Sequence, residues 1–501
     1  MDAPLVFDAV PVPTAAGAPL AVELVPAPNP WAVARKLSTL NRLLFLDSAE
    51  QHSERGRYSY VAAAPLLTVR GSAAKSQNWF DELAGMARGF RQPTVPGLPP
   101  FQGGFAGLFG YGLNRQLERV PASQFDEFSC PDVVVAVYTW VVAFDHTENR
   151  AWVVATDFPG LRAFDPASRD VGKRSASESL KQVLFDLTLP AGCGSPPRPR
   201  KGPIDPAALA PQYPLPGFPG VTSNFSRDGY IAAVARAVEY VHAGDCFQVN
   251  LSQRLLAPLR EHPLDLYGRL RSLNPAPFAG YFDLGDFQLL SASPERFLRC
   301  HPDGAVETRP IKGTRPRGRT PADDAAQLRD LVANPKDRAE NVMIVDLLRN
   351  DLGRVCEFGS VTVPRVCEPE TFRFVHHLVS EVRGKLKPGT GPFDLLAAAF
   401  PGGSVTGAPK VRAMEIIAEL EPTARGPYCG ALGWVGFDGA MDTNILIRTF
   451  TAGRGWVQFP VGGGVVADSD PRREYEETLH KAAGLLKALN PESPGTAGPG
   501  L

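Results

Sequence analysis

Residues 133–156 read VVVAVYTWVVAFDHTENRAWVVAT and include the longest apolar run of the chain. The run from Val133 to Phe144 is rich in β-branched residues and is shorter than the ~18 to 20 residues that a membrane-spanning helix needs. It therefore predicts a buried β-strand. The polar stretch DHTENR and a second apolar stretch, Ala151 to Thr156, follow it, which indicates an antiparallel hairpin.

The surrounding first half of the chain has the same character. Short β-like runs alternate with turn clusters from about Val22 to Asp157. Between Leu187 and Val221 proline is frequent, and because proline removes backbone donors and restricts the preceding residue, we expect a linker there. The predicted units are a strand-rich half (1–186), a Pro-rich linker (187–225), a second half (226–490) and a disordered tail (491–501).

The second half mixes helical and strand patterns. Ser226 is placed to cap a helix that reaches His242, and Phe247 to Ser252 alternate as in a strand. Further helices are predicted over 338–351, 410–419 and 471–486, and further strands over 430–437 and 444–451.

Composition excludes several classes of protein. The 501 residues include 52 Lys+Arg against 53 Asp+Glu, and 44% are hydrophobic, as in ordinary globular chains. Such a balance argues against proteins that coat nucleic acid or anionic membranes. The N-terminus lacks the pattern of a secretory signal, so we expect a cytoplasmic location. Seven scattered cysteines without CxxC spacing argue against a disulfide framework and a structural zinc site.

Five stretches of the second half combine glycine or turns with charged residues. They are SPERF (293–297), RPIKGT (309–314), KDRAEN (336–341), FPGGSVTGAPK (400–410), and GGG (462–464) with EYEETLHK (474–481). Lys312 precedes a Gly-Thr turn. It is a candidate nucleophile if burial or a nearby cation lowers its pKa from ~10.4; considered alone, a solvated turn lysine is the more common case.

Carboxylates and glycines suggest binding of a metal and of anions. Glu340 and Glu477 lie on different predicted helices, and two such carboxylates suit Mg²⁺, which keeps part of its hydration shell. Each alone reads as a surface charge. FPGGSVTGAPK is not a P-loop, because Ala-Pro stands where the motif needs Gly-Lys-Ser/Thr, but a glycine loop at a helix N-terminus still offers free N–H groups to an anion.

In this order, over roughly residues 226–486, these stretches resemble the chorismate-utilising enzymes. IVDLLRNDLGRV, FPGGSVTGAPKVRAMEII and, upstream, PFQGGFAGLFGYGL add to the similarity. The resemblance implies an α/β (α+β) fold in which two large, mainly antiparallel β-sheets pack as a sandwich with helices on the outside. Both halves of the chain would contribute to one sandwich, with the active site between them.

Within this family the motifs are most similar to those of aminodeoxychorismate synthases, component I. Lys312 stands where anthranilate synthases typically have alanine. The implied reaction converts chorismate and ammonia to 4-amino-4-deoxychorismate through a covalent lysine intermediate, for para-aminobenzoate and folate synthesis. Anthranilate synthase and a tryptophan- or chorismate-binding module without turnover stay open as alternatives, and a hydroxylation of the isochorismate type is less similar.

The resemblance also implies roles for individual residues. The expected catalytic residues are Lys312, Glu295 and His377, and the expected Mg²⁺ ligands are Glu340 and Glu477. The expected substrate-binding residues are Gly313, Thr314, Ser404, Tyr428, Arg448, Gly462, Gly463, Gly464 and Lys481. A tryptophan pocket would include Ser48, Tyr58, Ser59, Pro275, Ala276, Pro277 and Phe278. No catalytic-cysteine elbow is present, so ammonia would come from a separate glutamine amidotransferase subunit or from solution.

Overall fold

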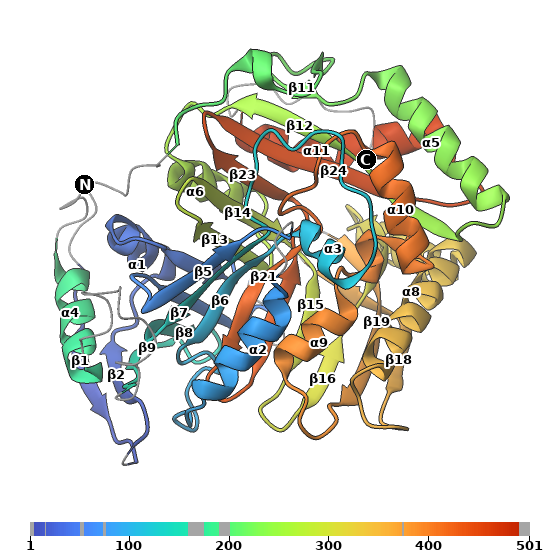
Figure 1. Cartoon of the computed structure of the whole chain (residues 1–501). Helices are drawn as coiled ribbons and strands as arrows, with labels where there is room; N and C mark the ends of the chain where they lie inside the picture. The colour runs from blue at the N-terminus through green and yellow to red at the C-terminus, as the bar shows by residue number, and fades with distance from the viewer. Residues whose placement is uncertain are drawn as a thin grey trace.

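The computed structural model describes residues 5–15, 17–50, 55–73, 77–158, 175–189, 201–372 and 375–489. The predicted tail (491–501) and residues 190–200 of the predicted linker lie outside these ranges. Within them the chain forms a 14-stranded and a 10-stranded sheet, whose paired strands run antiparallel (Figure 1). The predicted sandwich of two large antiparallel sheets is confirmed.

Both halves of the chain contribute to the larger sheet. Its strands, in spatial order, are β1 (Asp8–Val12), β2 (Leu20–Val25), β9 (Arg150–Ala155), β8 (Trp140–Asp145), β4 (Tyr58–Ala62), β3 (Leu44–Asp47), β13 (Phe278–Asp283), β14 (Phe287–Ser293), β23 (Thr449–Gly453), β24 (Trp456–Val465), β12 (Gln248–Pro258), β11 (Thr222–Ser223) and β10 (Tyr213–Pro214), with β20 (Gly407–Ala408) paired to β12. The halves join where β3 pairs with β13.

The smaller sheet is also shared. Its strands are β17 (Ile311–Pro316), β19 (Val375–Lys385), β16 (Ala305–Thr308), β15 (Arg296–Cys300), β22 (Met441–Ile445), β21 (Ala431–Gly436), β6 (Gly104–Phe109), β7 (Val133–Tyr138) and β5 (Leu67–Gly71), with β18 (Thr362–Thr371) paired to β19. Here the halves join where β6 pairs with β21.

Helices cover the outer faces of both sheets. They are α1 (Pro30–Lys36), α2 (Trp79–Gly89), α3 (Asn114–Leu117), α4 (Ala176–Thr188), α5 (Arg227–His242), α6 (Pro263–Leu273), α7 (Pro321–Ala333), α8 (Pro335–Gly353), α9 (Pro392–Ala399), α10 (Lys410–Leu420) and α11 (Pro471–Leu489). The predicted helix after Ser226 is confirmed, since the Ser226 side chain caps α5 by accepting from the Gly229 N–H at 3.0 Å. The predicted helices over 338–351, 410–419 and 471–486 correspond to α8, α10 and α11.

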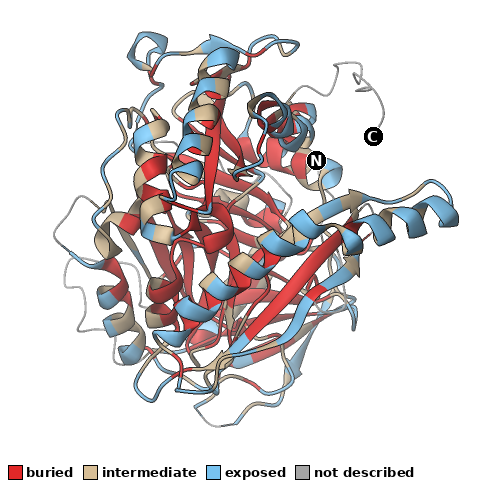
Figure 2. Cartoon of the chain, turned by 90° about the vertical axis from the view of Figure 1, so that its right-hand side faces the viewer, coloured by how far each residue is buried: buried red, intermediate tan, exposed pale blue. Residues whose placement is uncertain are grey.

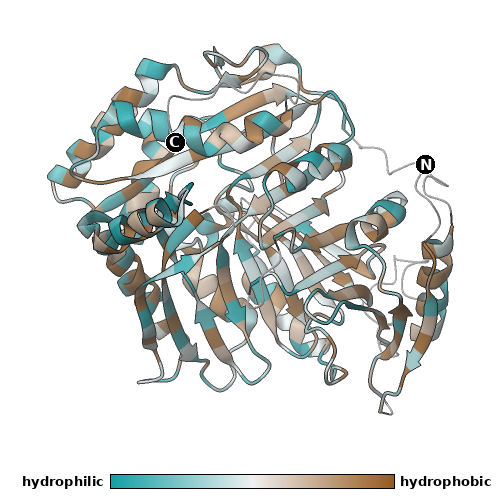
Figure 3. Cartoon of the chain, turned by 180° about the vertical axis from the view of Figure 1, so that it is seen from behind, coloured by the Kyte–Doolittle hydropathy of each residue, from teal (hydrophilic) through white to brown (hydrophobic). Residues whose placement is uncertain are grey.

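Three apolar layers hold this arrangement together. Helices α1, α4, α6 and α11 pack on the larger sheet, and α2, α8 and α9 pack on the smaller one. A third layer, which includes Leu108, Phe282 and Leu432, lies between the sheets. Buried residues accordingly follow the strands, while exposed and hydrophilic residues follow the outer faces of the helices (Figures 2 and 3).

The run from Val133 to Phe144 is two strands, not the one predicted. It breaks at Thr139, and β7 belongs to the smaller sheet while β8 belongs to the larger. Alternate side chains of each strand enter different apolar layers, so the sequence stays apolar across the break. The hairpin of β8 and β9 is confirmed.

The strand predicted over 444–451 is also wrong in its continuity. β22 ends at Ile445 in the smaller sheet, and β23 begins at Thr449 in the larger. Arg448, between them, has a φ of 51°, a left-handed conformation that a strand does not accommodate. The chain also crosses between the sheets from β14 to β15, at Pro294 and Glu295.

Other expectations concern the linker, the cysteines and membranes. Residues 201–225 carry a single 3₁₀ turn (Pro206–Ala208) and the two-residue strands β10 and β11. The six cysteines in the described ranges are free thiols. Among the helices of those ranges, none combines the length and apolar character that crossing a bilayer needs.

Candidate active site

A cavity of about 530 Å³ opens where β17 and β19 of the smaller sheet approach β24, α8 and α11. The expected site residues that line it are Glu295, Lys312, Gly313, Thr314, Glu340, His377, Ser404, Tyr428, Arg448, Gly462, Gly464, Glu477 and Lys481. Gly463, the remaining one, turns toward α11 and lies outside the lining. All residues that line the cavity belong to the second half of the chain, so the expectation that the active site lies between the two halves is wrong.

Lys312 and Glu295 both line this cavity, and their charged forms attract each other. Lys312 Nζ donates to the Ser404 carbonyl at 3.4 Å. Desolvation lowers the pKa of Lys312, against the attraction of Glu340 and Glu295. Burial raises the pKa of Glu295 to about 7, against the attraction of Lys312. Both shifts favour the uncharged forms, an amine and a carboxylic acid, which suit a nucleophile and a general acid.

The backbone around Lys312 is irregular. The register between β17 and β19 shifts between Lys312 and Thr314, and Gly313 has a φ of 77°, which favours glycine. The Thr314 hydroxyl lies 2.9 Å from His377 Nδ1. Burial, followed by the positive charge of Arg448, lowers the pKa of His377 to about 4, so this imidazole is neutral at pH 7.

Two of the crossings between the sheets supply polar groups to the cavity. Glu295 lies at the β14–β15 crossing, where the Ile445 N–H donates to the Glu295 carbonyl at 3.1 Å. Arg448 lies at the β22–β23 crossing, and its side chain makes no hydrogen bond or ion pair with any residue of the described ranges. The guanidinium is thus free to bind a carboxylate by two parallel hydrogen bonds.

Helix α11 presents its charges to the glycine run of β24. Lys481 Nζ donates to the Gly462 carbonyl at 2.9 Å and pairs with Glu477 at 2.7 Å. A Cβ on Gly463 would lie 3.1 Å from Glu474 Oε2 and 3.5 Å from Glu477 Oε1. Glycine at this position lets the helix lie close against the strand.

Glu340 and Glu477 have the chemistry of a magnesium site that keeps several waters. The Glu340 carboxylate makes no hydrogen bond or ion pair within the described ranges, and burial raises its pKa against the attraction of Lys312. Glu477 has its pKa lowered, because Lys481 and other cations outweigh the effect of burial. The described part of the chain holds no group of three or more His, Cys, Asp or Glu placed around one metal. Two carboxylates suit Mg²⁺, which takes its other ligands from water and substrate oxygens.

The structure adds lining residues that the sequence prediction missed. The polar and charged ones are Asn250, Arg315, Lys336, Asp337 and Glu474. Asn250 belongs to the polar face of an alternating strand, a signal that was available in the sequence. The others lie next to predicted residues on β17, α8 and α11.

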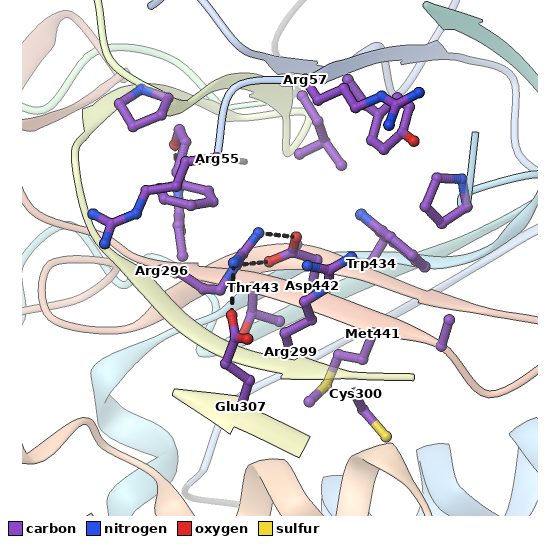
Figure 4. A pocket seen from close by; sticks show the side chains of 18 of the residues that line it. Arg55, Arg57, Arg296, Arg299, Cys300, Glu307, Trp434, Met441, Asp442 and Thr443 are labelled. Atoms are coloured by element: carbon purple, nitrogen blue, oxygen red, sulfur yellow. Dashed lines mark hydrogen bonds and ion pairs between the residues drawn. The ribbon is translucent and has the colours of Figure 1, made fainter. Parts of the chain in front are cut away.

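The residues of the predicted tryptophan pocket lie elsewhere. Ser48, Tyr58, Pro277 and Phe278 line a second cavity of about 420 Å³ (Figure 4), whereas Ser59, Pro275 and Ala276 are outside its lining. The Ser48 hydroxyl donates to the Tyr58 carbonyl at 2.6 Å. Tryptophan binding there stays a prediction.

Comparisons with known proteins agree with this picture. A family model described as chorismate binding enzyme matches residues 42–487. Anthranilate synthase component 1 of Thermus thermophilus is 40% identical over 474 residues, 91% of this chain and 94% of that protein. Aminodeoxychorismate synthase component 1 of Klebsiella aerogenes is 38% identical over 474 residues, 92% and 94%.

A solved structure is similar over the whole fold. The crystal structure of anthranilate synthase component I from Streptococcus pneumoniae has a TM-score of 0.72 at 32% identity, and the match covers 87% of this chain and 93% of that one. The family model spans most of the chain, and the two curated relatives align over nearly their whole length. This protein therefore belongs to the family of chorismate-binding enzymes.

Proposed function

We propose that this protein aminates chorismate at C4 to give 4-amino-4-deoxychorismate. The observation that carries the proposal is Lys312, whose amine lies in the cavity with its pKa lowered by desolvation and with Glu295 as a neighbour. An uncharged amine in this place is a nucleophile, which an alanine cannot be.

The proposed reaction has two additions. Lys312 Nζ adds to C2 of chorismate, the ring double bonds shift, and the C4–O bond breaks. Glu295 in its acid form protonates the departing oxygen, so water leaves, and its carboxylate then takes the proton that the Lys312 nitrogen loses. Ammonia next adds at C4, the double bonds shift back, and the C2–N bond breaks to free Lys312. Chorismate and ammonia thus yield 4-amino-4-deoxychorismate and water.

Other cavity residues would position the substrate. Arg448 and Lys481 supply cations for its two carboxylates, while Thr314 and the backbone of Gly464 supply donors. His377, neutral and held by Thr314, would lie near the leaving hydroxyl. Glu340 and Glu477 would hold Mg²⁺, which when bound would fix a ring carboxylate and stabilise negative charge.

Ammonia would come from a partner subunit. The name component 1 of the aminodeoxychorismate synthase relatives implies a second component, and we infer that a glutamine amidotransferase fills that role here. The product would then feed para-aminobenzoate and folate synthesis.

The test is incubation with chorismate, Mg²⁺ and ammonium, with the position of the new amine read by NMR. We expect substitution at C4, and we expect Lys312→Ala to reduce the rate by about 10³-fold or more. Lys385→Ala, which removes an exposed lysine paired with Asp303, is the matched control and should keep the wild-type rate. Normal C4 amination by the Lys312→Ala variant would contradict the mechanism.

Anthranilate synthesis is the second candidate, because the Thermus thermophilus relative that is 40% identical is an anthranilate synthase component. It requires amination at C2 and release of pyruvate, so the same NMR experiment separates the two activities. A binding module without turnover would give no product from the wild-type protein.

A further inference from the structure

Asn341 is a fully buried amide on α8, directly after Glu340. Its Nδ2 donates to the Leu378 carbonyl of β19 at 3.1 Å, and its Oδ1 accepts from the Ser380 hydroxyl of the same strand. Ser380 Oγ in turn accepts from the Cys367 N–H of β18 at 2.8 Å. A buried chain of hydrogen bonds therefore joins the helix to two strands of the smaller sheet.

The strand residue that Asn341 binds lies next to the groups of the active site. Leu378 directly follows His377 in β19, and it is the register partner of Lys312 in β17. The Asn341 hydrogen bond thus joins the residue after Glu340 to a residue that is adjacent to His377 and opposite Lys312. The three functional side chains come from α8, β19 and β17, and this contact connects their backbones.

The sheet is irregular at this place. The register between β17 and β19 shifts between Lys312 and Thr314, and such a shift interrupts the regular hydrogen bonds of the ladder. A Cβ on Gly313 would lie 3.0 Å from Asp337 Cβ, so the first turn of α8 packs directly on the irregular part of β17. A hydrogen bond from α8 to the neighbouring strand supplies a constraint that the ladder lacks there.

Burial alone does not require an amide at this position. Ile344, Val345 and Leu348 are buried apolar residues of the same helix, and with position 341 they have the spacing of one helical stripe. A leucine in place of Asn341 would continue that stripe. The amide interrupts it, and a buried polar network with its hydrogen bonds satisfied fixes one arrangement of the elements that it joins.

We propose that Asn341 is a positioning residue, which holds Glu340 at a fixed place relative to Lys312 and His377 and so raises the affinity of the active-site cavity for Mg²⁺. The inference rests on the proposed function in one respect, the assignment of Glu340 as a Mg²⁺ ligand. It does not depend on whether amination occurs at C4 or C2.

The test measures binding of Mg²⁺ to the full chain by calorimetry, with neither chorismate nor ammonia present. We expect Asn341→Leu to weaken this binding by about tenfold or more, as changes behind a metal ligand commonly do. Ser380→Ala removes the donor to Asn341 Oδ1 but leaves the bond to Leu378, and it should keep the wild-type affinity within about twofold. Full Mg²⁺ affinity in the Asn341→Leu variant would overturn the proposal.

A matched control separates positioning from a general loss of stability. Asn224 is also a buried amide with two hydrogen bonds, since its Nδ2 donates to Thr423 Oγ1 at 2.8 Å and its Oδ1 accepts from the Arg254 N–H at 2.8 Å. Asn224→Leu should lower the unfolding temperature as Asn341→Leu does, yet leave the Mg²⁺ affinity unchanged. An equal loss of Mg²⁺ affinity in both variants would overturn the proposal.

A further variant distinguishes failure of this inference from failure of the proposed metal site. Glu340→Gln should abolish Mg²⁺ binding. If it binds Mg²⁺ as the wild-type protein does, or if the wild-type protein binds none, the metal assignment is wrong and the role of Asn341 falls with it. If Glu340→Gln abolishes binding while Asn341→Leu keeps the wild-type affinity, only the positioning role is wrong.

Discussion

Glu295 couples the chemistry of this protein to its stability. Only 6% of its surface is exposed, and burial raises its pKa to about 7, against the attraction of Lys312. The folded protein therefore holds this proton more tightly than the unfolded chain does. Its stabilising contribution is complete below about pH 4.5 and is lost as the pH rises through about 7.

Replacing this acid should consequently stabilise the protein while it removes activity. We expect Glu295→Gln to raise the free energy of unfolding at pH 8 by an amount on the order of 3 kcal/mol, and to have little effect at pH 4. The rate of the same variant should be about 10² to 10⁴-fold lower, because an amide cannot act as a general acid or base in place of the carboxyl group. Urea unfolding at both pH values measures the first effect. A uniform gain at both would show that titration is not its cause.

Single residues of the active-site cavity were predictable to a large extent. Lys312, Glu295 and Glu340 lie in the short motifs RPIKGT, SPERF and KDRAEN. Each motif could be identified from neighbouring residues in the sequence. The pairing of Arg296 with Glu307 and Asp442 was not predictable, because it depends on a β-bulge and on acids from two other strands, and none of these relations is local in sequence.

At the scale of elements, one buried ion pair joins α10 to β12 and to the loop that carries Ser404. Arg425 donates to Glu421 at 2.8 Å and 2.6 Å, to the Asn250 carbonyl at 2.7 Å and to the Val405 carbonyl at 3.0 Å. Both side chains are at most 4% exposed. Asn250 and Val405 also line the active-site cavity, so this pair fixes part of its wall.

Removing one partner of this ion pair should destabilise the protein strongly, whereas replacing both partners should destabilise it much less. We expect Arg425→Met to destabilise the protein by about 3 to 5 kcal/mol, because Glu421 stays buried without its cation. The double variant with Glu421→Leu should recover most of that loss. Denaturant unfolding of the three proteins measures both effects, and a double variant no more stable than Arg425→Met would contradict this account.

Helices and strands were predicted well where a regular sequence signal, such as an apolar stripe or a polar turn, marks them. Helices α5, α10 and α11 follow their apolar stripes, and the hairpin of β8 and β9 follows its turn. The crossing at Thr139 was missed because β7 and β8 are buried on both faces and keep an apolar sequence on each side of the break. The hydrophobicity of such a stretch shows that it is buried, but it does not show to which sheet each strand belongs.

At the scale of the whole molecule, each half of the chain supplies strands that the other needs. β13 pairs with β3, and β21 pairs with β6. Residues 201–489 expressed alone would expose both of these sheet edges together with the apolar layer between the sheets, and exposed edges promote aggregation.

We therefore expect this fragment to be insoluble or to lack a cooperative unfolding transition, while the full chain unfolds as one unit. Size-exclusion chromatography and calorimetry of the fragment and the full chain provide the measurement. A monomeric fragment with its own sharp transition would show that the second half is an independent domain.

The crossing from β22 to β23 connects the active-site cavity to the apolar layer between the sheets. Leu446, fully buried in the layer between the sheets, stands two residues before Arg448. A smaller side chain there would let the two sheets settle closer and would move the guanidinium relative to the nucleophile. The reaction rate would then depend on apolar residues that do not contact the substrate, and natural selection would act on them as well.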